Sequence, residues 1–484
     1  MKTIGRDFGD VARKVYATAS GVLPNGKPVV INADGTVSVV TGADQALGSA
    51  VVFEAANALQ IKATFDSSNN KIVIAYSDVE NSRYGTAIVG TISGTSISFG
   101  TAVVFEAATV YNVSATFDSN ANKVVISYRD AGNSNYGTAI VGTVSGTNIS
   151  FGTPVIFFNG SCQQISSTFD SNVNKVVITF QSVVSSPYPV SAIVGTVSGT
   201  GISFGTAAVF NNANTSGQVV TFDSSANKVV IAYKDVGNSS YGTAIVGTIS
   251  GTDISFGTEV VFNSANGDQL GLDYDATAQK VVIAYRNFGN SSYGTAIVGT
   301  VSGTGISFGT AAVYNTAAVG TYSSVVYNAA VQKTVIFYLD GGNSSYGTFV
   351  VATISGTSIS FGTKAVFENA AANFLSAVYD SNAQKIAIAY QDAGNSNYGT
   401  AIVLQPGNAN ITAENYIGMS SGGQVASGSS ATVDIIGTVN SDQSSLTAGQ
   451  SYFVQTDGTL GLTADDPSVF AGTAISATKL LVKS

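Results

Sequence analysis

The chain has 484 residues, of which 44% are hydrophobic and only 10% are charged, and its 20 basic and 29 acidic residues give a formal net charge of −9. This acidic balance argues against a nucleic-acid partner, which requires a basic surface. The sequence contains no histidine and one cysteine, Cys162, which excludes a Ser-His-Asp triad, histidine-ligated zinc and an intrachain disulfide.

The N-terminal two dozen residues carry Lys2, Arg6, Arg13 and Lys14. We expect them to form either a docking arm or a frayed terminus. They lack the apolar core of a signal peptide, and no apolar run in the chain is as long as a membrane span, so we expect the protein to fold in a cytoplasm. The next segment, GKPVVINADGTVSVV at 26–40, predicts a β-hairpin around Asp34-Gly35.

Internal repetition is the strongest signal in the sequence. The phrase SGTxISFGT occurs six times at steps of 52 or 53 residues, and relatives of TFDSSNNKIVIAY occur seven times. The phenylalanines of the first phrase are Phe99, Phe151, Phe204, Phe256, Phe308 and Phe361. The anchor aromatics of the second are Phe65, Phe117, Phe169, Phe222, Tyr274, Tyr327 and Tyr379.

Each repeat contains four strand-like runs separated by turn signals. In the second copy these are VSATFD (strand a), KVVISYRD (strand b), YGTAIVGTV (strand c) and NISFGTPVIF (strand d), after which a connector leads to the next strand a. Strand b is apolar at consecutive positions, so both of its faces should be buried. Seven four-stranded sheets packed face to face predict an all-β fold with a seven-bladed β-propeller.

The two ends of the repeat region complement each other. The seventh copy has strands a, b and c but no strand d, and DQALGSAVVFE at 44–54 aligns with the strand d of other copies. We therefore expect this N-terminal strand to complete the last blade and close the ring, with a linear solenoid as the alternative. The predicted organisation is an arm and hairpin at 1–43, the propeller at 44–408 and a small β domain at 409–484, whose SYFVQTDGTLGLT, with Asp457, echoes the first hairpin.

Two sets of turns carry recurring acidic residues. In the a–b turns an aspartate or asparagine precedes a lysine by five positions, and we interpret the acid as a cap of its own turn. In the b–c loops an aspartate precedes Asn-Ser-x-Tyr-Gly. Calcium binding is one interpretation, and internal hydrogen bonding of the loop is the favoured one. The a–b residues are Asp66, Asp118, Asp170, Asp223, Asp275, Asn328 and Asp380, and the b–c residues are Asp78, Asp130, Asp235, Asp340 and Asp392.

The copies differ most in the connectors before strand a. In a propeller these connectors surround the central axis on one face. A set of amides and aromatics there is suited to bind sugar hydroxyls or a protein tip, while the alternative is that the amides bond neighbouring backbone. The third copy also departs from the pattern, with QSVVSSPYPVS at 181–191. The candidate ligand-binding residues are Gln60, Asn112, Gln164, Gln218, Gln269, Tyr322 and Phe374.

The sequence offers no set of catalytic residues. A sialidase-like site needs clustered arginines and a pair of carboxylates, but the only arginines are Arg6, Arg13, Arg83, Arg129 and Arg286. We expect no enzymatic activity, no metal and no cofactor.

The phrase NSNYGTAIVGTVSGTNISFGT and the tail from GSSATVDIIGTVNSDQSSLTAGQ to AGTAISATKLLVK resemble virion proteins of tailed bacteriophages, particularly marine ones. The first resembles propeller repeats in such proteins, and the second resembles C-terminal modules of phage fibre-like proteins. The resemblance implies no catalytic residues. It implies a virion component, such as a fibre or a decoration protein.

These observations predict a non-enzymatic virion surface protein, assembled in the host cytoplasm, that adheres to host-cell glycan or protein. Its terminal segments are expected to contact other virion proteins, with no nucleic-acid partner and no membrane insertion. The alternative is a purely structural head decoration or adaptor. A cellular glycan-binding lectin is a third possibility, which the missing export signal disfavours.

Overall fold

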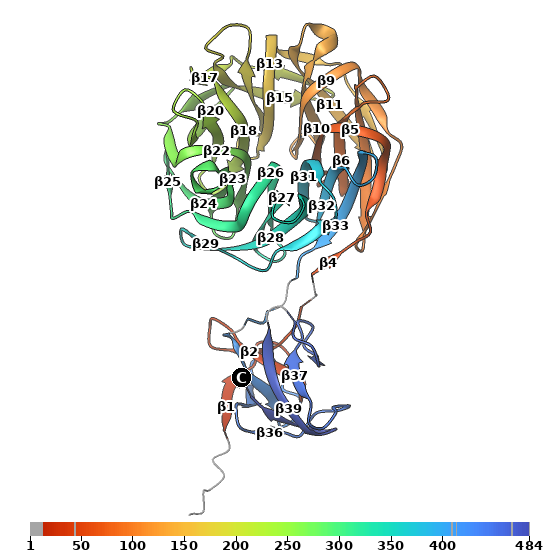
Figure 1. The fold of residues 1–484 in the computed structure, drawn as a ribbon, viewed down its shortest axis with the longest axis vertical. Helices are drawn as coiled ribbons and strands as arrows, with labels where there is room; N and C mark the ends of the chain where they lie inside the picture. The colour runs from red at the N-terminus through yellow and green to blue at the C-terminus, as the bar shows by residue number, and fades with distance from the viewer. Residues whose placement is uncertain (1–12, 43–44, 408–409, 413, 466–467, 484) are drawn as a thin grey trace, which may run out of the picture. The chain divides into compact units, whose positions relative to one another are not determined.

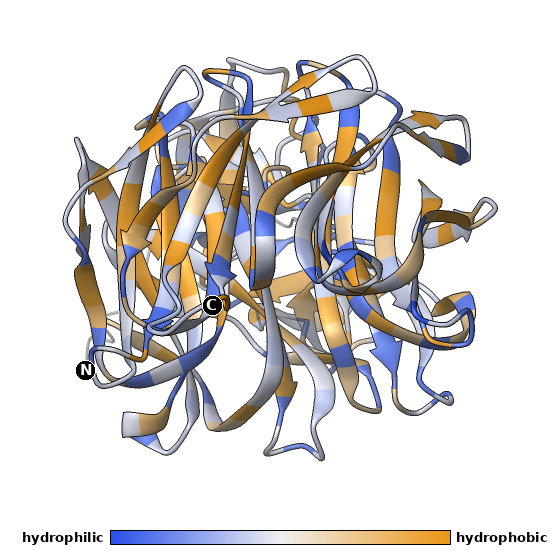
Figure 2. Cartoon of the chain, turned by 90° about the horizontal axis from the view of Figure 1, so that it is seen from above, coloured by the Kyte–Doolittle hydropathy of each residue, from blue (hydrophilic) through white to orange (hydrophobic). Residues whose placement is uncertain are grey.

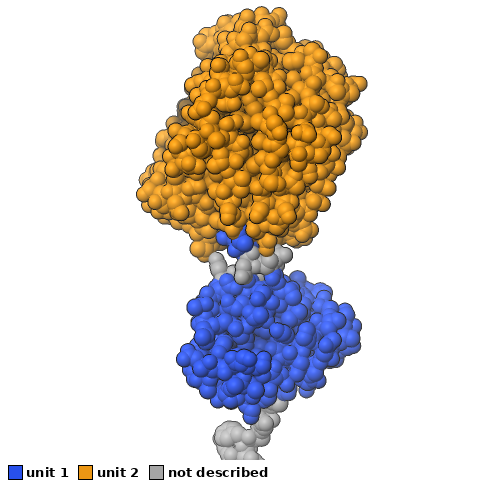
Figure 3. Space-filling model, turned by 90° about the vertical axis from the view of Figure 1, so that its right-hand side faces the viewer, with its two compact units in different colours: residues 1–46, 406–484 blue, residues 47–405 orange. Residues whose placement is uncertain are grey.

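The computed structural model describes residues 13–42, 45–407, 410–412, 414–465 and 468–483. Within these ranges the chain is built of antiparallel β-strands, with two short 3₁₀ turns at Ala131–Asn133 (η1) and Phe288–Asn290 (η2) (Figure 1). The predicted all-β class is confirmed. The chain forms two compact units, residues 47–405 (unit 2) and residues 1–46 with 406–484 (unit 1) (Figure 3). Among the described residues, no helix has the length and apolar character needed to cross a membrane.

The second repeat shows the local structure that recurs through unit 2. Strand b, β10 (Lys123–Asp130), pairs antiparallel with β9 (Val103–Asp118) on one side and with β11 (Tyr136–Ser145) on the other. The outer strand β12 (Asn148–Phe151) pairs with β11. The ends of β10 and β11 agree with the predicted strands b and c to within one residue, because turn residues bound both strands on each side.

The same four-strand pattern recurs along the chain. Strands a lie in β5 (Val51–Asp66), β9, β13 (Val155–Asp170), β18 (Thr215–Asp223), β22 (Val260–Asp275), β26 (Ala312–Asn328) and β31 (Ala372–Asp380). Strands b are β6 (Lys71–Asp78), β10, β14 (Lys175–Ser182), β19 (Lys228–Asp235), β23 (Lys280–Asn287), β27 (Lys333–Asp340) and β32 (Lys385–Asp392). Strands c are β7 (Tyr84–Ser93), β11, β15 (Val190–Ser198), β20 (Tyr241–Ser250), β24 (Tyr293–Ser302), β28 (Tyr346–Ser355) and β33 (Tyr398–Gln405). Outer strands are β8 (Ser96–Phe99), β12, β16 (Gly201–Phe204), β17 (Ala208–Asn211), β21 (Asp253–Phe256), β25 (Gly305–Phe308), β29 (Ser358–Phe361) and β30 (Ala365–Glu368).

The connectors differ from the expected loops. Most are continuous extended strands: the first half of β9 pairs with β7 of the preceding repeat, and its second half pairs with β10. The predicted strand d is instead interrupted after its phenylalanine. At Gly152 a Cβ would lie 2.0 Å from the backbone oxygen of Thr200 in the next repeat. This close approach between neighbouring sheets requires glycine and explains the recurrent FGT.

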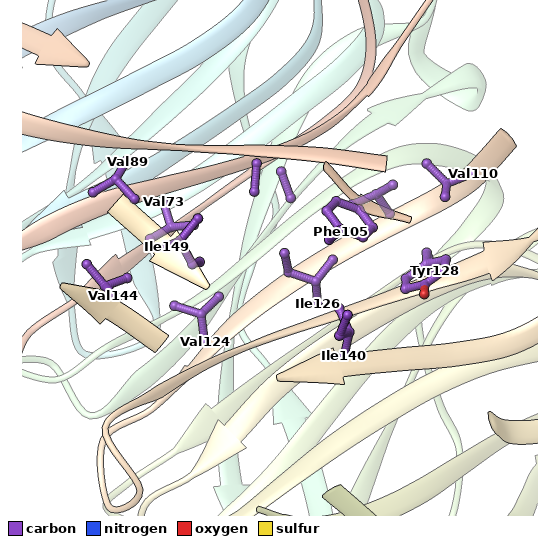
Figure 4. Packing of buried hydrophobic residues seen from close by; sticks show 13 residues of the cluster. Val73, Val89, Phe105, Val110, Val124, Ile126, Tyr128, Ile140, Val144 and Ile149 are labelled. Carbon is purple, nitrogen blue, oxygen red and sulfur yellow. The ribbon is translucent and has the colours of Figure 1, made fainter. Parts of the chain in front are cut away.

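Packing between sheets follows from the apolar character of strand b. Val124, Val125 and Ile126 on β10 are fully buried, as the prediction that both faces are covered requires. Figure 4 shows one such interface, where Val73 and Val89 of the first repeat pack with Val124 and Ile126 of the second. In Figure 2 hydrophobic segments run along many of the strands.

The strands a contact one another in chain order, and β31 in turn contacts β5. Strand β33 of the last repeat pairs antiparallel with the first half of β5, with Ala401 opposite Val51 and Thr400 opposite Val52. The expected N-terminal strand at 44–54 thus corresponds to pairing over Val51–Asn57, preceded by β4 (Ala46–Leu47), while Asp44 lies outside the described residues.

The recurring acidic residues stabilise turns, as predicted. Asp118 in an a–b turn is 2% exposed, and its Oδ1 accepts the backbone N–H groups of Asn120 and Ala121 at 3.0 and 2.8 Å. Asp130 in a b–c loop accepts the N–H of Asn133 at 3.2 Å. These carboxylates satisfy turn amides that the strands leave unpaired.

Unit 1 joins the two ends of the chain. One of its sheets has the order β1 (Lys14–Thr18), β35 (Ser430–Asp434), β34 (Tyr416–Ser421), β2 (Pro28–Ile31) and β3 (Val37–Val39). The other has the order β36 (Val439–Asn440), β40 (Lys479–Val482), β39 (Val469–Ser476), β37 (Ser451–Val454) and β38 (Leu460–Gly461). Their apolar sides share one core that includes Val30, Met419, Tyr452 and Leu480.

The segments at 1–43 and 409–484, which the sequence suggested as separate pieces, therefore belong largely to one unit, because each buries its apolar side against the other. The predicted echo between the two hairpins is real. Asp34 accepts the N–H of Thr36 at 3.0 Å, and Asp457 accepts that of Thr459 at 2.8 Å. Lys14 belongs to a paired strand rather than a free arm, while Lys2 and Arg6 lie outside the described residues.

Phe53→Ala tests the pairing of the first strand of the repeat region, β5, with the last, β33. Phe53 packs at 5.3 Å from Tyr76 and 5.7 Å from Phe99, and Phe105 makes the same contacts in the next repeat, at 5.3 and 5.8 Å from its partners. Each substitution should lower the free energy of unfolding by about 3–5 kcal/mol, measured by chemical denaturation. A much smaller effect for Phe53→Ala than for Phe105→Ala would show that β5 and β33 do not pair.

Candidate functional site

The predicted connector residues lie at a bulge in each strand a. The pairing of β5 with β6 shifts register between Leu59 and Lys62, and equivalent shifts occur in the other repeats. At six of these bulges the residue five positions before the anchor aromatic has φ between 49° and 64°: Gln60, Asn112, Gln164, Gly217, Gln269 and Phe374. This left-handed conformation is unfavourable for most residues, so it marks positions that the surrounding structure constrains.

Three of these amides form a chain of hydrogen bonds between repeats. Gln60 Oε1 accepts the backbone N–H of Asn112 at 3.0 Å, and Asn112 Oδ1 accepts that of Gln164 at 2.8 Å. Gln164 Oε1 in turn accepts the N–H of Gly217. For these three residues the structural alternative therefore holds, because their side-chain oxygens satisfy the backbone of the next repeat.

Glycine at 217 has no side chain to continue the chain of bonds. Strands β5, β18, β22, β26 and β31 surround a cavity of about 440 Å³, which Gly217 also lines. Five of the seven predicted site residues line it, namely Gln60, Gln218, Gln269, Tyr322 and Phe374. Asn112 and Gln164 are not among its lining residues. We call Gln218, Gln269, Tyr322 and Phe374, which line the cavity outside the chain of bonds, the open half of the predicted ring. Gln60 belongs to the chain of bonds and also lines the cavity.

Gln218 is the most informative polar group of the cavity. Its side chain is only 5% exposed, and neither its amide oxygen nor its amide nitrogen has a hydrogen-bond partner in the described structure. A buried amide without partners destabilises the folded protein by about 1–3 kcal/mol. A ligand that both donates and accepts a hydrogen bond would satisfy it.

Tyr322 and Phe374 form an aromatic wall. Their ring centroids are 4.9 Å apart with an interplanar angle of 43°. Tyr322 packs on the hydrophobic core that includes Leu375, and Phe374 packs on the neighbouring core that includes Ile61. Burial raises the pKa of Tyr322, so its hydroxyl stays protonated at neutral pH and is able to donate a hydrogen bond. The wall offers an apolar surface beside the polar amides.

Of the two charged residues that line the cavity, Asp268 has an ion-pair partner in the described part of the chain and Lys62 does not. Asp268 forms a bidentate ion pair with Arg286, at 2.8 Å from Nε and 3.0 Å from Nη2, and Arg286 also lies over the ring of Phe288 at 4.6 Å. Lys62, in contrast, has no carboxylate within ion-pair distance among the described residues. Its side chain is exposed to solvent within the cavity.

Asp273 lies on β22, the strand that also carries Gln269. Its carboxylate accepts the N–H groups of Tyr274 at 2.8 Å and Tyr327 at 2.7 Å. Burial raises its pKa to about 6, against the opposing effect of these hydrogen bonds. It replaces the threonine or valine found at the same position of the other repeats.

Sequence reasoning missed Lys62, Asp268 and Asp273. A comparison of equivalent positions in the seven repeats would have found Lys62 and Asp273, because each is the single charged residue at its position. Asp268 becomes part of the cavity only through the bulge in β22, which the sequence does not reveal.

The other candidate positions have structural roles. Gln181 of the divergent third copy is fully buried and bonds Gln163 at 2.6 Å and Asn214 at 2.7 Å. Cys162 is buried, and burial raises the pKa of its thiol to about 12, so it is a poor nucleophile. The described residues include no cluster of three or more acidic or cysteine side chains arranged to hold a metal ion.

No protein-family model matches the chain, and no curated protein matches its sequence. Among solved structures, the fold is similar to that of the BP39L lectin from Burkholderia pseudomallei, with a TM-score of 0.52 and 10% sequence identity. The match covers 74% of this chain and 99% of the lectin. At this identity the likeness concerns the fold alone, and it fits a β-propeller-like architecture.

Asp273→Asn should change the pH dependence of stability. The folded state keeps a proton on Asp273 up to about pH 6, whereas the unfolded state loses it near 3.8. Stability from this group is therefore present below pH 4 and lost as pH rises through 6, a change of about 3 kcal/mol. The difference in melting temperature between Asp273→Asn and wild type should increase in favour of the variant as the pH is raised from 4.5 to 7.5. The exposed Asp253→Asn serves as control, and parallel curves for Asp273→Asn and wild type would refute the assignment.

Proposed function

We propose that this chain is a seven-bladed β-propeller, closed by its N-terminal strand, that acts as a non-enzymatic glycan-binding protein on the surface of a bacteriophage virion. The observation that carries the binding function is the open half of the ring. There Gln218, whose buried amide has no hydrogen-bond partner among the described residues, lines the same cavity as the aromatic pair Tyr322 and Phe374.

The chemistry of the cavity suits a sugar. A pyranose has an apolar face of C–H groups and an edge of hydroxyls that both donate and accept hydrogen bonds. The aromatic wall matches the face, and the amides of Gln218 and Gln269 match the edge. The volume of about 440 Å³ falls within the range of small-molecule sites, roughly 300–1,000 Å³. That the similar solved structure is described as a lectin agrees with this proposal.

The proposal of a binding rather than a catalytic role rests on the same residues. The cavity lining includes one carboxylate, Asp268, which is held by Arg286. Glycoside hydrolysis usually needs two carboxylates flanking the bond that breaks. A held carboxylate and a chain without histidine favour recognition over chemistry.

The virion location rests on the resemblance of the repeat and tail phrases to phage proteins. In this proposal unit 1, which contains both ends of the chain, attaches to other virion proteins, and unit 2 presents the cavity. The alternative, a purely structural decoration or adaptor, is favoured by one observation: Gln60, Asn112 and Gln164 use their amides to join repeats.

Glycan binding is tested by titrating purified protein against a panel of neutral and acidic sugars. Phe374→Ala and Gln218→Ala should each weaken binding about tenfold or more, equivalent to about 1.4 kcal/mol, because they remove the apolar wall and the hydrogen-bonding edge. Tyr16→Ala, an exposed aromatic 70% accessible in unit 1, should bind as wild type. Absence of binding to every sugar of the panel would rule out the glycan-binding role at this cavity.

The virion location is tested by immunogold labelling of phage particles with antibodies against the purified chain. A few copies at the tail would support adhesion, and many copies on the head would support decoration. A chain that no particle carries would exclude both virion roles.

A further inference from the structure

Lys62 is exceptional among its equivalents in the seven repeats. Three residues before the anchor aromatic, the other repeats have serine, valine or glycine, while the first repeat has lysine. The equivalent position has the same register in each repeat, since Lys62 is opposite Ala75 just as Ser376 is opposite Ala389. The difference is therefore a true substitution at one structural position rather than a shift of alignment.

The serines at this position stabilise the ring. Ser114 Oγ accepts the N–H of Ser167 at 3.0 Å, and Ser376 Oγ accepts the N–H of Ala63 at 3.0 Å. Ser324 Oγ accepts the N–H of Ala377 at 3.2 Å. An ammonium group only donates, so Lys62 cannot make this bond to the next strand. The first repeat thus loses an inter-repeat hydrogen bond and gains a solvent-exposed charge at the cavity.

Nothing in the described structure neutralises that charge. No carboxylate lies within 4.0 Å of Lys62 Nζ among the described residues, and the one carboxylate of the cavity lining, Asp268, is bonded to Arg286. Lys62 therefore makes the cavity positive within a chain of net charge −9. An acidic protein repels anions in general, so an unpaired ammonium in its cavity is a local and specific feature.

The ammonium shares the cavity with groups that recognise hydroxyls. Gln218 is nine-tenths buried with both amide atoms unpartnered among the described residues, and Gln269 and the Tyr322–Phe374 wall also line the cavity. The combination of one cation, two amides and an aromatic wall corresponds to a ring with hydroxyls, an apolar face and one negative charge.

We infer that the cavity selects a sugar that carries a carboxylate, such as a hexuronic acid, and that Lys62 binds this carboxylate. The inference rests on the proposed glycan-binding function and adds its specificity. A charge-assisted hydrogen bond from the ammonium to the carboxylate would distinguish the acidic sugar from its neutral counterpart. The lysine acts as a specificity residue, whereas the amides and the aromatic wall contribute to the binding of both sugars.

The test compares glucuronate with glucose, and galacturonate with galactose, by calorimetric titration at low salt. Wild type should bind the better acidic sugar about tenfold or more tightly than its neutral partner. Lys62→Ser should abolish this preference, and Lys62→Arg should retain it. Serine is the residue that four other repeats have at this position, so the variant is compatible with the fold, which a thermal melt will check.

Lys71→Gln is the matched control, because it removes one positive charge from the same repeat at the start of β6, outside the cavity lining. It should keep the preference for the acidic sugar. Equal binding of acidic and neutral sugars by wild type would overturn the inference and leave the proposed glycan-binding function intact. No binding of any sugar would overturn both. A preference for a sulfated neutral sugar over the uronate would show that the cavity reads charge rather than a carboxylate, and would also overturn it.

Discussion

The architecture of unit 2 depends on the burial of both faces of strand b. Val124, Val125 and Ile126 are all completely inaccessible, so the sheet that contains them needs an apolar neighbour on each side. No single repeat can satisfy this requirement alone. The repeated phrase is constant because each repeat meets the same neighbour in the same way. Gly137, for example, lies under Phe157, where a Cβ would be 2.5 Å from the ring.

The inner edges of the sheets pose a second problem, because strands a have no further strand to pair with. Side chains satisfy some of the unpaired backbone N–H groups, because serine hydroxyls and amide oxygens of one repeat accept hydrogen bonds from N–H groups of the next. Gly217 has no side chain to accept such a bond, and the side chains of Phe374 and Lys62 lack an acceptor, so these three repeats depart from the pattern. The cavity lies where these departures gather, and it is there that we place function.

Much of the fold was predictable because the same pattern of apolar runs and turn residues recurs in the seven repeats. Strand boundaries at β10 and β11, the double burial of strand b and the capping role of Asp118 all agree with the structure. The continuous strands between repeats were not predicted, since alanines, asparagines and threonines in segments such as 107–112 lack the alternation that signals a strand. The union of the hairpin at 26–40 with the C-terminal segment was also missed, because only an echo of the Asp-Gly-Thr turn connects them in the sequence.

The candidate site shows the same division. The sequence by itself determined the period, the all-β class, the turn chemistry and the seven variable positions, because each of these depends on residues close together in the chain. It could not separate Gln164, whose oxygen bonds the next repeat, from Gln218, whose amide has no partner. Both are glutamines in variable connectors, and only the tertiary structure decides which amide finds an acceptor or donor among residues about 50 positions away. The cavity likewise exists only because five distant strands bring their bulges together around one space.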